Sequence, residues 1–447
     1  MSRIRKKHSA LAPFAVSFLL LILAGSLLLT LPVSGAGGLR IPYFKALFTS
    51  VSAVCVTGLS IINPAVELSP FGQAVLLLLI QLGGLGFMTV ATSFLAFAGR
   101  RMSLRGRLVM QESLNSEGLG GIAMLLRWIV CSTLAVEGVG ALLLAARFIP
   151  RYDIAKGMWY SLFHSISAFC NAGFTIFPDS DSLTAFQTDP LVNVVIMLLI
   201  ITGGIGFAVL ADVKRVKSFR RLMLQSKIVL IGTAILLTLG TVCTLLSEWN
   251  NPGTLGGMSV GKKLLSASFY SVTLRTAGFN TFAIAPISPA LKLLSAVFMF
   301  IGASSASTGG GIKVNTVAVV LLDMLRTARG RTNLHLFHKR ITRYAVDRSH
   351  VILSLALTIL TAGSIVILSL APGIDAIDLI FESASALGTV GLSSCGTGSL
   401  PLAAQALLMI LMYIGRIGPL SIAILIAKRQ DATAESVKYP SEHILLG

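Results

Sequence analysis

Four short segments of this 447-residue chain repeat one arrangement of polar residues around a glycine. They read TSVSAVCVTGLS at 49–60, HSISAFCNAGFT at 164–175, YSVTLRTAGFN at 270–280 and ESASALGTVGLS at 382–393. Glycine tolerates the positive φ that turns successive carbonyl oxygens to one side of a loop. Such oxygens can replace the water molecules that surround a hydrated cation. The chemistry that these residues predict is therefore cation coordination by backbone oxygens.

The four segments recur at a fixed place within a larger repeat. Their glycines, Gly58, Gly173, Gly278 and Gly391, are 115, 105 and 113 residues apart. A full apolar span and a short helical piece precede each loop, and a second span with a glycine-rich patch follows it. These patches are IQLGGLGF (80–87), IITGGIGF (200–207), FIGASSASTGGG (300–311) and YIGRIGPL (413–420). Each unit would cross a membrane twice, re-enter once, and begin and end on the same side.

The repeats predict the fold class: an all-α membrane protein with eight transmembrane helices and four re-entrant pore loops around a central pore. Since the units keep one topology, they are parallel repeats about an axis along the membrane normal. Irregular backbone at membrane depth is tolerated only where it is buried or lines water, so the loops are expected to share one cavity. The predicted parts are pore repeats at 1–115, 116–225, 226–345 (with a gating loop at 302–313) and 346–430, and a cytoplasmic tail at 431–447.

Composition supports a membrane protein. Of the residues, 54% are hydrophobic and 12% charged, and the mean hydropathy is +0.84, whereas soluble domains have about 25% charged residues. A spanning helix needs about 20 apolar residues. The apolar run at 11–31 is long for a signal peptide and lacks a small-residue cleavage site, so we expect an uncleaved first span. Stretches without Asp, Glu, Lys or Arg cover 9–39, 68–99, 190–211, 228–247, 293–312, 351–374 and 383–415.

The formal net charge of +18 is concentrated between the spans. Of the 36 Lys and Arg residues, 24 lie within 3–7, 100–107, 214–227, 326–348 and 428–438. By the positive-inside rule these segments and both termini face the cytoplasm. Nucleic acid is excluded as a partner, because no soluble stretch is long enough to carry a basic face.

Other kinds of site find little support. The five cysteines form no CxxC pair, and His335 and His338 lie in a basic loop, so neither set predicts a transition-metal site. The chain has no HExxH, GxSxG, Walker or paired-carboxylate pattern, and TGGGIK at 308–313 lacks the GxxxxGK[ST] frame, so we expect no enzyme. A secondary transporter of a larger solute remains an alternative, although such proteins usually have inverted repeats.

The short helices favour a cation at the centre. Each ends at its loop, so the partial negative charge of its C-terminal end points inward. Rings of carbonyls replacing a hydration shell are the basis of potassium filters. The competing interpretation is that the glycines only permit close helix packing. One serine–glycine frame at the same place in four units favours the pore interpretation.

These motifs resemble those of the Trk/Ktr/HKT superfamily of potassium transporters. The motifs AVCVTGLS, AFCNAGFT, VTLRTAGFN, ALGTVGLS and GASSASTGGGIK carry the resemblance, which covers nearly the whole chain and is strongest to KtrB-type membrane subunits. It implies potassium uptake across a bacterial plasma membrane, with potassium ion as substrate, sodium as a candidate activator and no cofactor in this chain. A sodium-selective or unselective monovalent cation transporter of the same superfamily is the alternative.

The resemblance also implies the residues of a potassium filter. In plant relatives a serine at the first glycine accompanies sodium preference, so Gly58 favours potassium. The filter carbonyls would come from three residues in each loop: Val56, Thr57 and Gly58; Asn171, Ala172 and Gly173; Thr276, Ala277 and Gly278; Thr389, Val390 and Gly391.

The segment 302–313 resembles the family's intramembrane gating loop, a plug below the filter that must move. Its four glycines among Ser and Thr would interrupt a helix on composition alone, and a simple kink is the alternative. Arg416 lies inside the last span, where a lone arginine is costly and by default functional. The family assigns a gate role to the matching arginine, and a salt bridge or a carbonyl cap is the alternative. The implied gate residues are Gly302, Ser304, Ser305, Ser307, Thr308, Gly309, Gly310, Gly311, Lys313 and Arg416.

Two further cations have expected places. Lys313 ends the gating loop, and we expect it to reach the cytoplasmic side. Arg275 precedes the third loop, and we expect it to brace that loop, with Glu382 as its carboxylate partner.

The resemblance implies partners as well. A homodimer is expected, each protomer with its own pore, seated on a cytoplasmic ring of nucleotide-binding RCK subunits of the KtrA/KtrC type. Nucleotide would bind only that ring. The basic loops would meet acidic patches on it, or anionic membrane lipid. By analogy, the tail YPSEHILLG (439–447) would serve the dimer contact.

Overall fold

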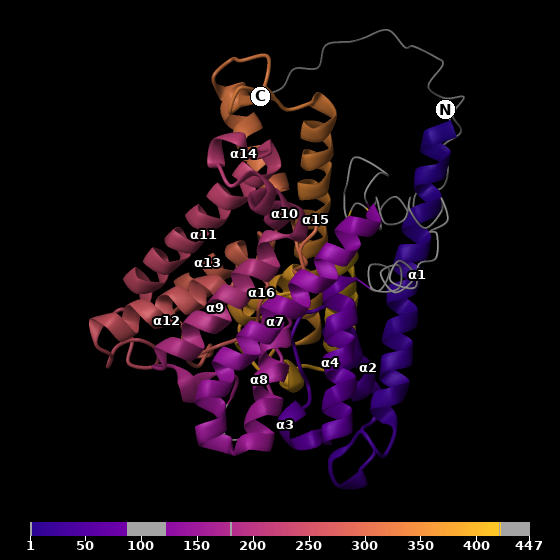
Figure 1. Ribbon diagram of the computed structural model, residues 1–447, viewed down its shortest axis with the longest axis vertical. Helices are drawn as coiled ribbons and strands as arrows, with labels where there is room; N and C mark the ends of the chain where they lie inside the picture. Colours follow the sequence, from indigo (N-terminus) through magenta and orange to yellow (C-terminus); the bar gives the residue numbers. More distant parts are fainter. Residues whose placement is uncertain (1, 87–121, 179–180, 420, 422–447) are drawn as a thin grey trace.

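The computed structural model describes residues 2–86, 122–178, 181–419 and 421 (Figure 1). The basic cluster at 100–107 and the tail at 431–447, for which a cytoplasmic location and a dimer contact are expected, lie outside the described residues. Helices make up nearly all of the regular structure that is described.

One order of helices occurs four times: a long helix, a shorter helix that ends at a glycine loop, and a third helix. In the first two repeats they are α1 (Ser2–Thr30), α2 (Tyr43–Val54) and α4 (Pro70–Leu85), then α7 (Ile122–Tyr152), α8 (Ile154–Phe169) and α9 (Pro190–Ile205). In the last two they are α11 (Leu224–Glu248), α12 (Val260–Thr273) and α13 (Pro289–Phe300), then α15 (Arg343–Leu370), α16 (Ala376–Gly388) and α17 (Leu402–Ile417).

Smaller elements connect these helices. They are α3 (Pro64–Glu67), α10 (Phe207–Val216), α14 (Val314–Ala328), and the 3₁₀ turns Ala36–Gly38, Thr184–Phe186, Phe219–Arg221 and Thr397–Ser399. Strands β1 (His335–Leu336) and β2 (Lys339–Arg340) form an antiparallel hairpin in which His335 faces Arg340.

Proline starts the third helix in three repeats, where its missing N–H needs no partner. The side chain of the residue before it caps the helix: Ser69 accepts from the Gly72 N–H at 3.1 Å, and Asp189 accepts from the Leu191 N–H at 2.9 Å. In the fourth repeat Pro401 is itself the N-cap of α17. These caps fix where the chain turns back after each loop.

The third helix of each repeat packs against the short helix of the next repeat. The pairs are α4 with α8, α9 with α12, α13 with α16, and α17 with α2. The last pair joins the fourth repeat to the first, so the repeats close into a circle. The final turns of the four short helices, including Val54, Phe169, Thr273 and Leu387, are buried at its centre.

A serine on the short helix ties it to the long helix in three repeats. Ser50 Oγ donates to Ile22 O at 2.7 Å, Ser165 Oγ to Glu137 O at 2.6 Å, and Ser271 Oγ to Leu237 O at 2.7 Å. The same bond at the same place makes Ile22, Glu137 and Leu237 equivalent positions.

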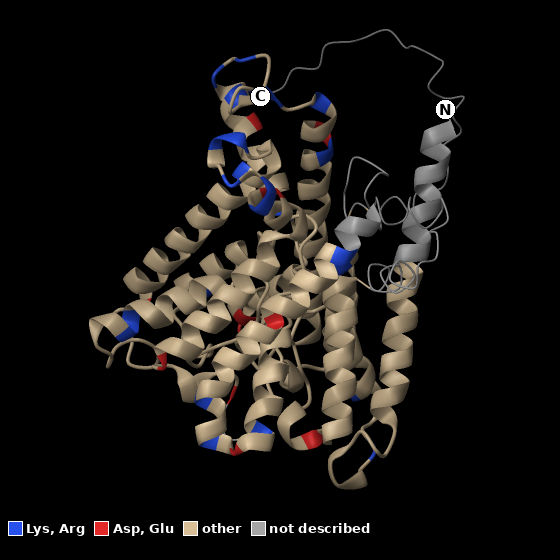
Figure 2. Ribbon diagram, in the orientation of Figure 1, with Lys and Arg blue, Asp and Glu red and all other residues tan. Residues whose placement is uncertain are grey.

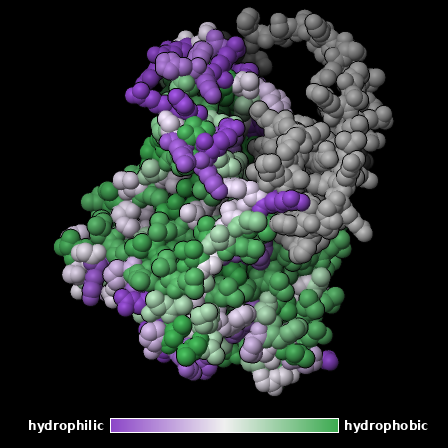
Figure 3. Space-filling model, in the orientation of Figure 1, coloured by the Kyte–Doolittle hydropathy of each residue, from purple (hydrophilic) through white to green (hydrophobic). Residues whose placement is uncertain are grey.

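Among the described residues, three helices are long and apolar enough to cross a membrane alone: the apolar part of α7, α11 and α15. Helices α9 and α10 pass the same test together but are bent by 94°, and shorter apolar helices lie at Ala15–Thr30, α4, α13 and α17. Lys and Arg gather at the end of the molecule that holds α14, α10 and the start of α15 (Figure 2). A broad apolar band covers the middle (Figure 3).

The ion pair of Lys292 and Asp378 joins α13 to α16, with 2.6 Å between Nζ and Oδ1 and side chains only 11% and 18% exposed. We expect Lys292→Met to lower the free energy of unfolding by about 3 kcal/mol, because it strands a largely buried carboxylate. Thermal melting in detergent would report the loss. The double variant Lys292→Met with Asp378→Leu should regain most of the lost stability. A double variant as unstable as Lys292→Met alone would show that the stranded Asp378 carboxylate is not the cause of the loss.

Candidate functional site

The four loops share an unusual backbone conformation. The residue two before each glycine is left-handed, although it carries a side chain: φ is 54° at Val56, 58° at Asn171, 64° at Thr276 and 53° at Thr389. The glycines follow at φ of 96°, 71°, 77° and 94°. Valine and threonine rarely adopt this conformation, and such strain persists where the surroundings enforce it, often at functional sites.

The glycines of the four loops are next to one another in a ring. A β-carbon on Gly58 would lie 2.5 Å from the Ala172 carbonyl oxygen, and one on Gly173 would lie 2.8 Å from that of Ala277. A β-carbon on Gly278 would be closer still to Val390 O, and one on Gly391 to Thr57 O. The last contact returns to the first loop, so backbone meets backbone around a closed circle with no room for a side chain.

The N–H groups of the loops are used within their own repeats. The N–H groups of Thr57, Ala172 and Val390 each donate to a serine carbonyl five residues earlier, at 2.8 Å. The third loop is one residue shorter, and there Ala277 N donates to Thr273 O at 3.0 Å. These bonds hold the loops without involving their carbonyl oxygens.

The carbonyl oxygens of the loops are free. Among the residues that the structure describes, none of the carbonyls at 56–58, 171–173, 276–278 and 389–391 accepts a hydrogen bond. Most of these residues are fully buried, including Val56, Asn171, Ala277 and Val390. More than about 90% of buried backbone groups in proteins are paired. A ring of buried, unpaired oxygens is therefore suited to a partner that brings positive charge.

The segment 302–313 lies directly against this ring, between α13 and α14. A β-carbon on Gly309 or Gly310 would clash with the hydroxyl of Thr276 or Thr389, and Gly310 N donates to Thr389 Oγ1 at 3.1 Å. The segment is irregular rather than helical, with a turn at 305–306, and residues 301 and 312 form a parallel bridge.

Other repeats hold the segment in place. Ser304 N donates to Gly204 O at 3.0 Å, Thr308 Oγ1 to Phe169 O at 3.0 Å, and Gly311 N to Gly415 O at 3.2 Å. Two of these three backbone oxygens belong to glycines of third helices, Gly204 of α9 and Gly415 of α17. Sequence reasoning assigned no role to Gly204 or Gly415, although the glycine-rich patches were the available signal.

Arg416 links the segment to two repeats. Its guanidinium donates to Thr308 O, to Gly83 O, and to Gly84 O at 3.0 Å. The carbonyl cap that the sequence left as an alternative is therefore present. Because one of its acceptors belongs to the segment 302–313, the same contacts also place Arg416 where it can hold that segment.

The side chain of Lys313 turns back onto its own segment. Its Nζ donates to Gly309 O at 2.8 Å and to Gly310 O at 3.3 Å. Lys313 therefore contributes to the internal hydrogen bonds of the segment 302–313, immediately before α14 begins.

The pairing of Arg275 with Glu382 was also wrong. Glu382 is fully buried and accepts hydrogen bonds from Ser393, Cys395 and Thr397, which follow the fourth loop. Its carboxylate is occupied by its own repeat. Arg275 instead lies between α12 and α9, beside a small apolar pocket.

Transition-metal chemistry gains no support. Within the described part of the chain, no three His, Cys, Asp or Glu side chains are grouped to hold a metal ion.

Long apolar helices in a circle of four repeats place the chain in a class of helical membrane proteins, here with a ring of backbone oxygens at the centre. The chain belongs to the TrkH family of cation transport proteins, whose family model matches residues 8–436. The resemblance seen in the motifs is thereby confirmed.

Curated relatives cover the chain almost completely. It is 37% identical over 433 residues to Ktr system potassium uptake protein B of Bacillus subtilis, covering 97% of this chain and 96% of that protein. The protein of the same name from Vibrio alginolyticus is 39% identical over 434 residues (97% and 94%). Potassium/sodium uptake protein NtpJ of Enterococcus hirae is 37% identical over 449 residues (100% and 99%).

A solved structure shares the fold. The potassium transporter TrkH from Vibrio parahaemolyticus matches with a TM-score of 0.73 at 19% identity, over 94% of this chain and 85% of that one. The helical fold predicted from the repeats therefore agrees with that of a membrane transporter.

Proposed function

We propose that this chain takes up potassium across a bacterial plasma membrane, through a filter formed by the four glycine loops. The observation that carries the proposal is the closed ring of buried, unpaired carbonyl oxygens. Three relatives that match nearly the full chain are named as potassium or potassium/sodium uptake proteins. Potassium is the substrate in this proposal, and the protein needs no cofactor of its own.

The proposed architecture has eight spans and four re-entrant loops. The long helices α1, α7, α11 and α15 would cross the membrane, and α4, α9, α13 and α17 would cross it again after each loop. The apolar band and the basic end of the molecule support this orientation, with that end in the cytoplasm (Figures 2 and 3).

The proposed gate is the segment 302–313 together with Arg416. It lies against the ring and is attached by hydrogen bonds to the second and fourth repeats, so an ion leaving the ring would meet it. Movement of this segment would open the path.

The proposed assembly is a homodimer on a cytoplasmic ring of nucleotide-binding subunits. The word "system" in the names of the Ktr relatives supports a partner subunit. The basic segments 214–227 and 326–348 would face that partner, or anionic lipid.

A sodium-selective or unselective transporter is the second candidate, favoured by the potassium/sodium relative. The test is Gly58→Ser, because a β-carbon there would press on the Ala172 carbonyl and open the ring at one edge. We expect the rubidium-to-sodium flux ratio in proteoliposomes to fall about tenfold, which needs a change of only about 1.4 kcal/mol in relative binding. A wild-type chain that passes both ions equally would support the second candidate, and a ratio that Gly58→Ser leaves intact would remove the first loop from the filter.

A further inference from the structure

The residue three positions before each loop glycine lies behind its loop. In the second repeat this residue is Cys170, and its surroundings are polar. Cys170 Sγ is 3.4 Å from Gln81 Oε1, and Gln81 Nε2 donates to Glu137 Oε2 at 3.1 Å. Glu137 is only 2% exposed. A buried carboxylate thus stands behind the second loop.

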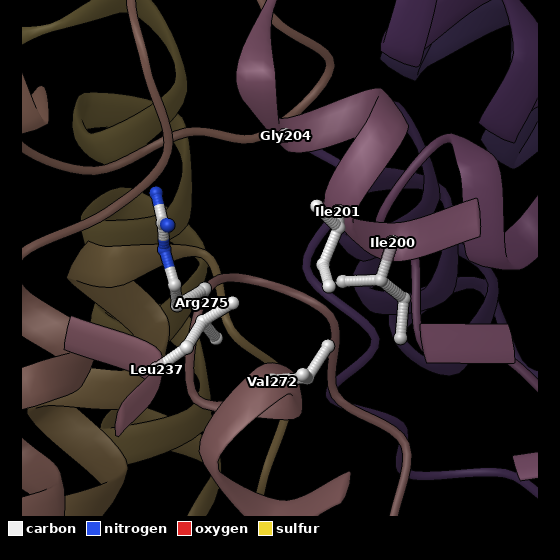
Figure 4. A pocket seen from close by; sticks show the side chains of 6 residues that line it. All are labelled: Ile200, Ile201, Gly204, Leu237, Val272 and Arg275. Carbon is white, nitrogen blue, oxygen red and sulfur yellow. The ribbon is translucent and has the colours of Figure 1, made fainter. Parts of the chain in front are cut away.

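The equivalent residue in the third repeat is Arg275. Its pocket is lined by Val272 of the preceding helix α12, by Ile200, Ile201 and Gly204 of α9, and by Leu237 of α11 (Figure 4). Leu237 occupies the position that Glu137 occupies in the second repeat, since each backbone carbonyl accepts the equivalent serine bond. The third site therefore has a cation where the second has a thiol, and leucine where the second has a carboxylate.

Arg275 is a buried cation. The residue is 7% exposed, and its Nε has no hydrogen-bond partner. Throughout the part of the chain that the structure describes, no carboxylate forms an ion pair with it. The free space beside it is about 10 Å³, which has room for about one water molecule.

Arg275 is next to the ring through its backbone. Asn171 Nδ2 of the second loop lies 3.3 Å from Arg275 O and 3.2 Å from Thr276 Oγ1. Thr276 is the first carbonyl residue of the third loop. The positive charge also follows the C-terminal end of α12, whose partial negative charge stabilises it.

We propose that Arg275 supplies a fixed positive charge behind the third loop that weakens cation binding at the ring and so speeds release of the ion. The inference rests on the proposed filter. A ring of free carbonyls and four helix ends attracts cations, and conduction requires binding that is weak enough for the ion to leave. An unpaired arginine beside the ring offsets part of this attraction, and the pocket lacks the carboxylate that would cancel it.

The first test replaces the charge. Arg275→Met removes it at similar length, and Arg275→Lys keeps it. By Coulomb's law, a unit charge about 10 Å from a bound ion, at an effective dielectric constant of about 20, changes the ion's affinity about tenfold or more. The concentration of rubidium that half-saturates uptake into proteoliposomes should therefore fall about tenfold in Arg275→Met, together with the maximal rate. Arg275→Lys should keep both near wild type. Equal behaviour of the two variants would overturn the proposal.

The second test keeps the arginine and adds its missing partner. Leu237→Glu places a carboxylate in the pocket at the position of Glu137 in the second repeat, and Leu237→Gln is the uncharged control of equal size. Leu237→Glu should reproduce the tighter half-saturation while Leu237→Gln leaves it unchanged. A half-saturating concentration that stays at the wild-type value in Leu237→Glu would overturn the proposal even if the Arg275 variants fail to fold.

Failure of this inference is separable from failure of the proposed function. If Gly58→Ser alters the ion preference but the Arg275 and Leu237 variants leave half-saturation unchanged, the proposed filter is supported. The charge of Arg275 then has no role in ion binding. If Gly58→Ser leaves the ion preference intact, the first loop is not part of the filter, and the inference loses the closed ring on which it rests.

Discussion

Gly391→Ala is expected to abolish rubidium uptake. Its β-carbon would overlap the Thr57 carbonyl oxygen more closely than any of the other three loop glycines overlaps its neighbour, and the backbone there has φ of 94°. A side chain is strained in that conformation whatever the space around it. Since every loop touches the next, displacement of Thr57 would disturb the ring on both sides. We expect residual uptake of a few per cent at most in proteoliposomes.

Gly373→Ala is the matched control. Gly373 lies between α15 and α16 in the same repeat, with no atom within 4 Å of an added β-carbon and no positive φ. Uptake by Gly373→Ala should equal that of the wild type. Normal uptake by Gly391→Ala, with protein of normal abundance and melting temperature, would show that the ring tolerates a side chain and that its backbone contacts are not needed for transport.

The sequence predicted the repeats because their signals are local. Apolar runs, glycine-rich patches and a loop glycine at a fixed place each depend on a few neighbouring residues. The third loop is one residue shorter than the others. It could still be aligned with them by its glycine, Gly278, which the loop conformation requires. The match with the family and with a solved transporter confirms the helical fold.

What the sequence did not predict depends on contacts between repeats. Val56 and Thr389 adopt a left-handed conformation that their β-branched side chains disfavour, so only the closed ring explains it. The inward turn of Lys313 and the separation of Arg275 from Glu382 follow from which carbonyls and carboxylates are already occupied. Which acceptors already have partners cannot be read from the sequence. Aligning the repeats does, however, show one signal: Arg275 stands where the second repeat has Cys170.

Arg416→Ala is expected to raise uptake about tenfold. Arg416 donates hydrogen bonds to Thr308 O of the proposed gate and to Gly83 O and Gly84 O of α4, so it joins the segment to a fixed helix. A hydrogen bond to a charged group contributes roughly 1.5–3 kcal/mol. Loss of even about 1.4 kcal/mol from the closed state raises the open fraction about tenfold while that fraction is small. Rubidium uptake into proteoliposomes, at constant protein content, measures the change.

Arg416→Lys separates two ways in which the arginine could close the path. Lysine keeps the positive charge, which repels a cation below the ring, but a single ammonium cannot make the forked contacts of a guanidinium with both elements. If Arg416 acts mainly by holding the segment, Arg416→Lys should raise uptake nearly as much as Arg416→Ala. If it acts mainly by its charge, only Arg416→Ala should do so. If neither substitution raises uptake, Arg416 is not part of the gate. Its role is then only to cap the backbone carbonyls to which it donates.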